Sequence, residues 1–131
     1  MKKSAVVVRT KFSMEFMIKS SPEFLYTYIS SPSGLSEWFA DDVRLNGDIF
    51  TFEWEGSEEK AKLLSKRMNK FVKFQWLNKG PEEYFSFEID QDDLTGDVAL
   101  IITDFEEEAS INESQMIYNV SVEKLRQTIG G

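Results

Sequence analysis

The sequence predicts one α+β domain, in which a curved antiparallel sheet wraps around a long C-terminal helix. Three observations carry this prediction. The length of 131 residues is that of a single domain. Segments in which apolar and polar residues alternate fill the middle of the chain, and short turn sequences separate them. An apolar stripe with helical spacing then ends the chain.

The first predicted elements are one strand and two short helices. Residues 11–19 alternate between apolar and polar side chains, which is typical of a strand with one buried face. Ser21 and Ser31 are each followed by a proline, and a serine N-cap followed by proline indicates the start of a helix. We expect the second helix to end near residues 40–42.

The alternation of apolar residues predicts five further strands. Turn sequences such as Asn46-Gly47 and Thr95-Gly96 separate them, and short loops between successive strands imply an antiparallel meander. The last of these strands is apolar on both faces, so we expect it in the interior of the sheet or covered on both sides. The predicted strands cover residues 49–55, 58–68, 71–77, 84–90 and 97–105.

The last predicted element is a helix that begins after Ser110. A glutamate three residues later gives the spacing of a capping box, and Gly130 is placed to end the helix. A sheet curved around such a helix is the helix-grip architecture, and we expect Phe74, Phe87 and Leu125 to be buried in it. The apolar stripe of the helix consists of Tyr118, Val122, Leu125 and Ile129.

The composition excludes several classes of function. The chain has no cysteine and no histidine, so a disulfide, a thiolate nucleophile and a Ser-His-Asp triad are excluded. The net charge of −8 repels phosphate, which argues against a nucleic-acid partner. No apolar run approaches the roughly 18 residues of a membrane span, and the run at 6–8 is too short for a signal peptide. We expect a cytoplasmic protein without a cofactor or a metal.

Four segments resemble a known family, and they are 21–26 (SPEFLY), 31–41 (SPSGLSEWFAD), 50–54 (FTFEW) and 95–105 (TGDVALIITDF). With these segments the chain resembles the START-like (SRPBCC, helix-grip) superfamily. Within it, the chain is similar to bacterial homologues of the heat-shock protein 90 ATPase activator. The resemblance begins near residue 11, so we expect one domain over residues 1–131 with residues 1–10 as an N-terminal extension.

The resemblance implies a helix-grip fold and a tendency to hold hydrophobic ligands between the sheet and the long helix. It implies no catalytic residues, because the family has no shared catalytic motif. Activator homologues carry a Gly-Trp pair near the start of the last helix, whereas this chain has 114–118 (SQMIY) there. This difference weakens any transfer of chaperone function.

Aromatic residues are abundant, with 11 Phe, 4 Tyr and 3 Trp. Their rings either line a ligand cavity or simply fill the core, which is the favoured interpretation, because large rings dominate a small core in both cases. Trp38 and Phe39 either gate the mouth of a cavity or anchor a short helix, and anchoring is favoured. The candidate ligand-binding residues are Phe16, Trp38, Phe39, Phe52, Trp54, Phe74, Trp76, Phe85, Phe87 and Tyr118.

Clusters of acidic residues suggest a calcium site only superficially. Asp41-Asp42 with Asp48, or the segment 90–93, could supply oxygen ligands, but the second lacks the glutamate expected at the twelfth position of a calcium loop. A solvated turn rich in aspartate is the better interpretation. We likewise interpret residues 106–108 as solvated charge that complements the N-terminus of the last helix.

The favoured hypothesis is non-catalytic binding of a small hydrophobic or amphipathic ligand between the sheet and the C-terminal helix. The alternative is a protein-interaction module of the chaperone-activator type, with a protein partner, or a homodimer or other homo-oligomer with a collapsed cavity. An enzyme that uses Asp104 or Glu53 as a buried acid or base ranks last, and no residue is assigned as catalytic.

Overall fold

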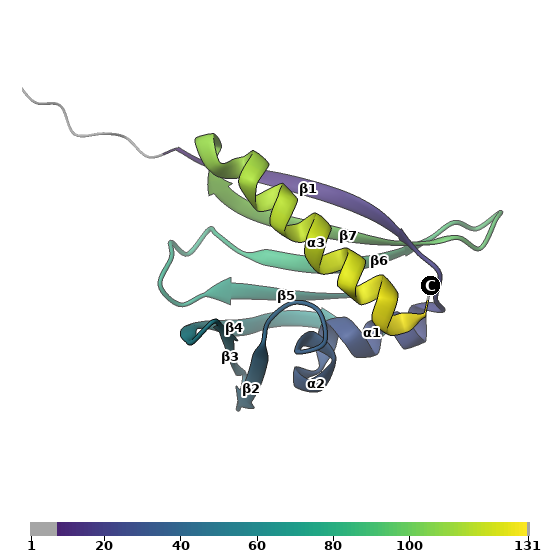
Figure 1. Cartoon of the computed structure of the whole chain (residues 1–131), viewed down its shortest axis with the longest axis horizontal. Coiled ribbons are helices and arrows are strands. Elements are labelled where there is room, and N and C mark those ends of the chain that lie inside the picture. The colour runs from purple at the N-terminus through teal and green to yellow at the C-terminus, as the bar shows by residue number, and fades with distance from the viewer. Residues whose placement is uncertain (1–7, 131) are drawn as a thin grey trace, which may run out of the picture.

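Two layers make up the structure, a seven-stranded sheet and the helices on one of its faces (Figure 1). The computed structural model describes residues 8–130. In chain order the elements are β1 (Arg9–Ile18), α1 (Pro22–Ser30), α2 (Pro32–Leu35), β2 (Asp42–Asn46), β3 (Ile49–Trp54), β4 (Ser57–Arg67), β5 (Phe71–Trp76), β6 (Phe85–Gln91), β7 (Val98–Glu107), η1 (Glu108–Ser110) and α3 (Ile111–Ile129). The strand order is β1-β7-β6-β5-β4-β3-β2, and all neighbours are antiparallel.

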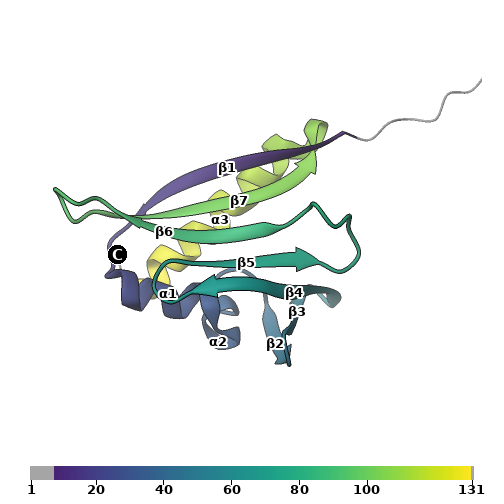
Figure 2. The same cartoon turned by 180° about the vertical axis from the view of Figure 1, so that it is seen from behind.

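The long helix α3 packs across one face of the sheet, against β1 and β7. Figure 1 shows α3 in front of these strands. Figure 2 shows the opposite face of the sheet, which no helix of residues 8–130 covers. Tyr118, Val122 and Leu125 form the buried stripe of α3, and Leu125 is fully buried. The predicted helix-grip architecture is therefore confirmed. Within residues 8–130, no helix is long and apolar enough to cross a membrane.

Phenylalanine rings from β3, β5 and β6 fill the core beneath the helices. Phe74 lies opposite Phe85 in the register of β5 and β6, and their ring centroids are 4.9 Å apart. The predicted burial of Phe74 and Phe87 is confirmed, since neither has exposed surface. The rings of this core that are at most 2% exposed are those of Phe50, Phe52, Phe74, Phe85 and Phe87.

The first and last strands pair along their whole length. β7 lies between β1 and β6, so the predicted interior position of this strand is confirmed. Arg9 and Thr10 pair with β7, so the last two residues of the extension expected at 1–10 belong to the sheet. Chain ends are often poorly ordered, which predicts poor order for residues 1–4, and these residues lie outside the described part of the chain.

Serine caps begin the two short helices as predicted. The Ser21 hydroxyl accepts a hydrogen bond from the Phe24 N–H at 3.1 Å, and the Ser31 hydroxyl accepts one from the Gly34 N–H at 3.0 Å. A proline at the first helical position fixes the backbone at each start.

The prediction that the second helix continues to residues 40–42 is wrong. α2 ends at Leu35, and residues 36–39 form turns, with the N–H groups of Trp38, Phe39 and Ala40 all donating to the Leu35 carbonyl. Trp38 and Phe39 are both buried there, with 3% and 7% of their surface exposed. Consecutive side chains of an α-helix diverge by about 100°, so a turn serves better than a helix to bury both rings.

The edge strand β2 is absent from the predicted set. Its five residues do alternate, with Val43 and Leu45 between polar neighbours, but the run is short and Val43 is its only buried residue. Pairing with β3 holds β2 in place. The Arg44 guanidinium adds ion pairs with Asp42, Glu53 and Glu58 across the edge of the sheet.

The capping box predicted at Ser110 is wrong, whereas the predicted end of the helix is confirmed. The turn η1 precedes α3 and leaves Ser110 at φ −107° and ψ 3°, where its side chain accepts no capping hydrogen bond. Gly130 takes a left-handed conformation with φ 90°, and its N–H donates to the Arg126 carbonyl at 3.0 Å. Glycine adopts this conformation without steric cost.

We expect Leu125→Ala to lower the free energy of unfolding by about 2 to 5 kcal/mol, because it leaves a cavity between α3 and the sheet. Urea denaturation monitored by circular dichroism measures the change. Lys124→Ala is the matched control on the neighbouring exposed position. A loss below about 1 kcal/mol for Leu125→Ala would contradict the packing of α3.

Gly34→Ala tests the close contact between α1 and α2. A Cβ atom at Gly34 would lie 2.1 Å from the Thr27 carbonyl oxygen and 2.6 Å from the Tyr28 Cα, so the backbone itself must move. We expect a loss of about 1 to 3 kcal/mol or more in unfolding free energy. Gly80→Ala is the control, because a Cβ there meets nothing within 4 Å. Equal stability of the two variants would show that the helices are not in this contact.

Candidate functional site

A cavity of about 150 Å³ lies between the sheet and α3. Strands β3, β5 and β7 supply one wall, α3 supplies the other, and the turns after α2 close one side. Ile117 is 60% exposed, so its side chain lies where the cavity meets solvent. The lining residues are Phe39, Trp54, Trp76, Asp104, Ser114, Ile117, Tyr118 and Ser121.

Hydrogen bonding and ring contacts hold the aromatic wall of the cavity in place. The indole N–H of Trp54 donates to the Phe39 carbonyl at 2.8 Å, which ties β3 to the turns after α2. The Phe39 ring stands edge to face with Trp54 at 5.4 Å and nearly parallel to Tyr118 at 6.5 Å. Trp54 and Trp76 lie 6.3 Å apart on neighbouring parts of the wall. The cavity thus has fixed aromatic surfaces.

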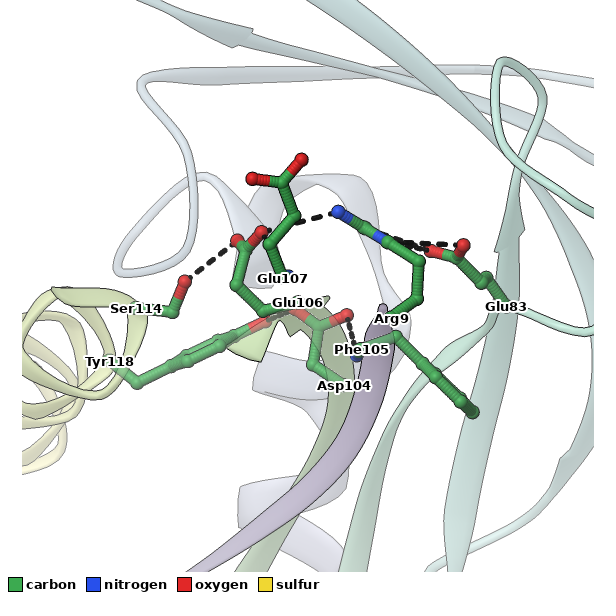
Figure 3. A network of polar contacts seen from close by, with 8 residues as sticks. All are labelled: Arg9, Glu83, Asp104, Phe105, Glu106, Glu107, Ser114 and Tyr118. Atoms are coloured by element: carbon green, nitrogen blue, oxygen red, sulfur yellow. Dashed lines mark hydrogen bonds and ion pairs between the residues drawn. The ribbon is translucent and has the colours of Figure 1, made fainter. Parts of the chain in front are cut away.

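Among the described residues that line the cavity, only Asp104 carries a charge. The Tyr118 hydroxyl donates to its Oδ2 at 2.7 Å, and the Phe105 N–H donates to its Oδ1 at 2.7 Å. Figure 3 shows the Tyr118 side chain reaching from α3 to the Asp104 carboxylate on β7. This hydrogen bond therefore joins the two walls of the cavity.

Burial changes the acidity of both partners. Desolvation raises the pKa of Asp104 from 3.8 to about 6, although the hydrogen bonds from Tyr118 and Phe105 and the charge of Lys79 act against this rise. The pKa of Tyr118 lies well above 10, because burial and the neighbouring Asp104 carboxylate disfavour the phenolate. At neutral pH Asp104 is therefore largely ionised and Tyr118 is a neutral donor.

A second carboxylate, Glu106, extends the polar network away from the cavity (Figure 3). Its side chain accepts hydrogen bonds from Ser114 at 2.8 Å and from Arg9 at 3.3 Å, and Arg9 also binds Glu83 at 2.8 Å. Burial raises the pKa of Glu106, but the hydrogen bonds from the Glu107 N–H and Ser114 and the charge of Arg9 outweigh it, so the pKa is lowered. The expectation of free solvated charge over residues 106–108 is thus wrong for Glu106.

The structure brings some of the candidate ligand-binding residues to the cavity and others to the core. Phe39, Trp54, Trp76 and Tyr118 line the cavity. The candidates that do not line it are buried in the core instead, and they are Phe16, Trp38, Phe52, Phe74, Phe85 and Phe87.

Trp38 and Phe39 take different places. The indole N–H of Trp38 donates to the Tyr28 carbonyl at 2.8 Å, and its ring lies 5.1 Å from Phe87. Trp38 therefore anchors the turns after α2 on α1 and on the core. Phe39 is buried too, but its ring also forms part of the cavity wall.

Four lining residues are absent from the candidate ligand-binding set, and they are Asp104, Ser114, Ile117 and Ser121. Ser114 and Ser121 share one side of α3 with Tyr118, because they lie four residues before it and three after it, and Ile117 lies three residues after Ser114 and four before Ser121. Helical spacing from Tyr118 was therefore the available signal. Asp104 carried a signal as well, because it is a charged residue within a predicted apolar strand.

The other acidic candidates do not form sites. Glu53 does not line the cavity and pairs with Arg44 at 3.4 Å. Asp92 Oδ1 accepts hydrogen bonds from the N–H groups of Leu94 and Thr95, which makes the β6–β7 connection a polar turn. Among residues 8–130, no group of three or more acidic side chains is arranged to hold a metal ion.

The raised pKa of Asp104 predicts how stability depends on pH. Because the folded protein binds this proton more tightly than the unfolded chain, stability is greatest when Asp104 is protonated. It should fall by on the order of 3 kcal/mol as the pH rises from about 4 to about 7. Asp104→Asn should remove this decrease, and urea denaturation at each pH measures it. The exposed Asp93→Asn is the control. The same pH profile in all three proteins would contradict the desolvated carboxylate.

Comparison with known proteins identifies the family. The START-like superfamily domain matches residues 6–131. The solution structure of BfR322 from Bacteroides fragilis is 33% identical, with 92% of this chain and 91% of that chain covered and a TM-score of 0.64. No curated protein matches the chain.

More distant structures share the fold. The Aha1 dimer from Colwellia psychrerythraea is 20% identical, with a TM-score of 0.72, over 89% of this chain and 93% of that chain. DynU16, from the dynemicin biosynthetic locus, is 12% identical, with a TM-score of 0.76, over 92% of this chain and 47% of that chain. The match of the family over residues 6–131, the identity to BfR322 and the helix-grip fold agree, and the chain belongs to the START-like superfamily.

Proposed function

We propose that the protein binds a small hydrophobic or amphipathic ligand, without catalysis, in the cavity between the sheet and α3. The observation that carries the proposal is an open cavity whose wall consists of the rings of Phe39, Trp54 and Trp76, with one carboxylate, Asp104, among them. Apolar walls with a few convergent polar groups are typical of ligand sites. The family membership supports the same function.

The size of the cavity limits the ligand. About 150 Å³ is enough for a benzene ring and well below the roughly 300 to 1,000 Å³ of larger ligand sites. A single ring or a short alkyl chain fits inside. Any longer part of the ligand would extend past Ile117 into solvent.

The polar groups favour binding over catalysis. Within residues 8–130, Asp104 is the only charged residue that lines the cavity, and the Tyr118 hydroxyl donates a hydrogen bond to it. The high pKa of Tyr118 disfavours its use as a base. A general acid or base needs a pKa near the working pH and a position at the reacting atoms. Among the described lining residues, Asp104, with a pKa of about 6, has no second group of this kind beside it.

Self-association through α3 is a second candidate function. Met116, Ile117 and Val120 form an apolar patch on the outer side of α3, where they are 68%, 60% and 72% exposed. Ile117 belongs to this patch and to the cavity opening, so a second copy seated on it would cover the opening. The Aha1 of Colwellia psychrerythraea is a dimer of the same fold.

Native mass spectrometry of the protein purified gently from its own host tests the proposal. We expect an added small mass that is lost on denaturation. Ser121→Leu should abolish the added mass, because the larger side chain fills the cavity from α3. Asn119→Leu places the same side chain on an exposed position of α3 and should retain the ligand. A bare monomer in the wild type contradicts ligand binding, and a dimer without added mass favours the second candidate.

A further inference from the structure

We infer that the ligand of this cavity is a small organic ammonium ion, held by the Asp104 carboxylate and by the aromatic wall. The inference rests on the proposed function and specifies its ligand class. An amine that carries one ring or a short alkyl chain meets the description.

The hydrogen-bonding groups that line the cavity favour a ligand that donates hydrogen bonds. The Tyr118 hydroxyl proton is committed to Asp104, and the Ser114 hydroxyl proton is committed to Glu106. Two hydrogen bonds leave the Asp104 carboxylate with further lone pairs, and each of these hydroxyl oxygens can also accept. Apart from the Ser121 hydroxyl and the Trp76 indole N–H, the polar side-chain groups therefore offer acceptors, and with the Asp104 carboxylate among them they complement N–H groups better than a carboxylate or a phosphate.

The electrostatics around Asp104 also favour a cation. No ion pair within residues 8–130 involves Asp104. The charged groups that act on it are Lys79, from the loop between β5 and β6, and Glu106, on its own strand. Arg9 is shared between Glu106 and Glu83. From α3, the neutral Tyr118 hydroxyl faces the carboxylate. The Lys79 charge acts on Asp104 without forming an ion pair, and an ammonium ion in the cavity would supply the direct partner.

The aromatic wall suits the same cation. Electron-rich ring faces attract ammonium groups, and tryptophan does so most strongly. Trp76 already has a cation near it, since the Lys79 ammonium lies 5.7 Å from its ring centroid. Trp54 and Phe39 present further rings beside Asp104. One ammonium ion could therefore contact the carboxylate and ring surfaces at once.

Three ring compounds of similar size but different charge test the inference. Benzylamine is a cation at neutral pH, benzyl alcohol is neutral and benzoate is an anion. Titrations followed by amide and indole shifts in NMR spectra give their affinities. We expect benzylamine to bind about tenfold more tightly than benzyl alcohol, and benzoate to bind most weakly.

Two comparisons locate the effect at Asp104. Asp104→Asn should reduce the advantage of benzylamine over benzyl alcohol to less than about threefold, whereas Asp93→Asn, which removes one exposed carboxylate, should retain it. In the wild type, lowering the pH from 7 to 5 should weaken benzylamine binding by about tenfold, because the pKa of Asp104 is about 6. Benzyl alcohol should bind equally at both values.

The outcomes separate this inference from the proposed function. Equal binding of benzylamine and benzyl alcohol would overturn the ammonium ligand and leave the ligand cavity intact. Failure of all three compounds to bind would overturn both. The pH comparison in the wild-type protein decides the question even if Asp104→Asn does not fold.

Discussion

Burial of the apolar stripe of α3 against the sheet is the interaction on which the rest of the structure depends. Val122 and Leu125 have no exposed surface, and Tyr118 continues the stripe toward the start of the helix. Within the described residues, the outer side of the helix is exposed to solvent, as at Met116 and Val120. The helix therefore owes its position to one face, since most of the stability of a helix in a protein comes from the packing of its apolar face. The cavity lies beside Tyr118, whose hydroxyl donates a hydrogen bond to Asp104.

Aromatic residues fill the core and also line the cavity, and the position of each ring in the fold decides which of the two it does. The rings of Phe74 and Phe85 stack on each other in the core. Trp54 and Trp76 stand at the ends of β3 and β5 and line the cavity. Phe39 connects both sets, because it is buried against the core rings and also forms part of the wall. The turns after α2, which replace the expected helical end, are what put Phe39 there.

Periodic patterns predicted most of the fold, because alternation and helical spacing report directly which side chains are buried. They failed where burial is sparse, as in β2 with Val43 alone, and where backbone geometry decides, as at Ser110. The site was harder to predict. Aromatic residues on a strand face predicted apolar surroundings but not which rings border empty space. That distinction depends on how α3 crosses the sheet, which brings Asp104 and Tyr118 together from positions 14 residues apart.

Asp104 is a desolvated carboxylate in the wall of the cavity, and its ionisation can be followed directly. An NMR titration of the side-chain carboxyl carbon of Asp104, without and with saturating benzylamine, tests this most directly. We expect a pKa of about 6 in the free protein and a lower value in the complex, because the bound cation favours the charged carboxylate. A pKa near 3.8 in the free protein, or one that benzylamine leaves unchanged at saturation, would contradict it.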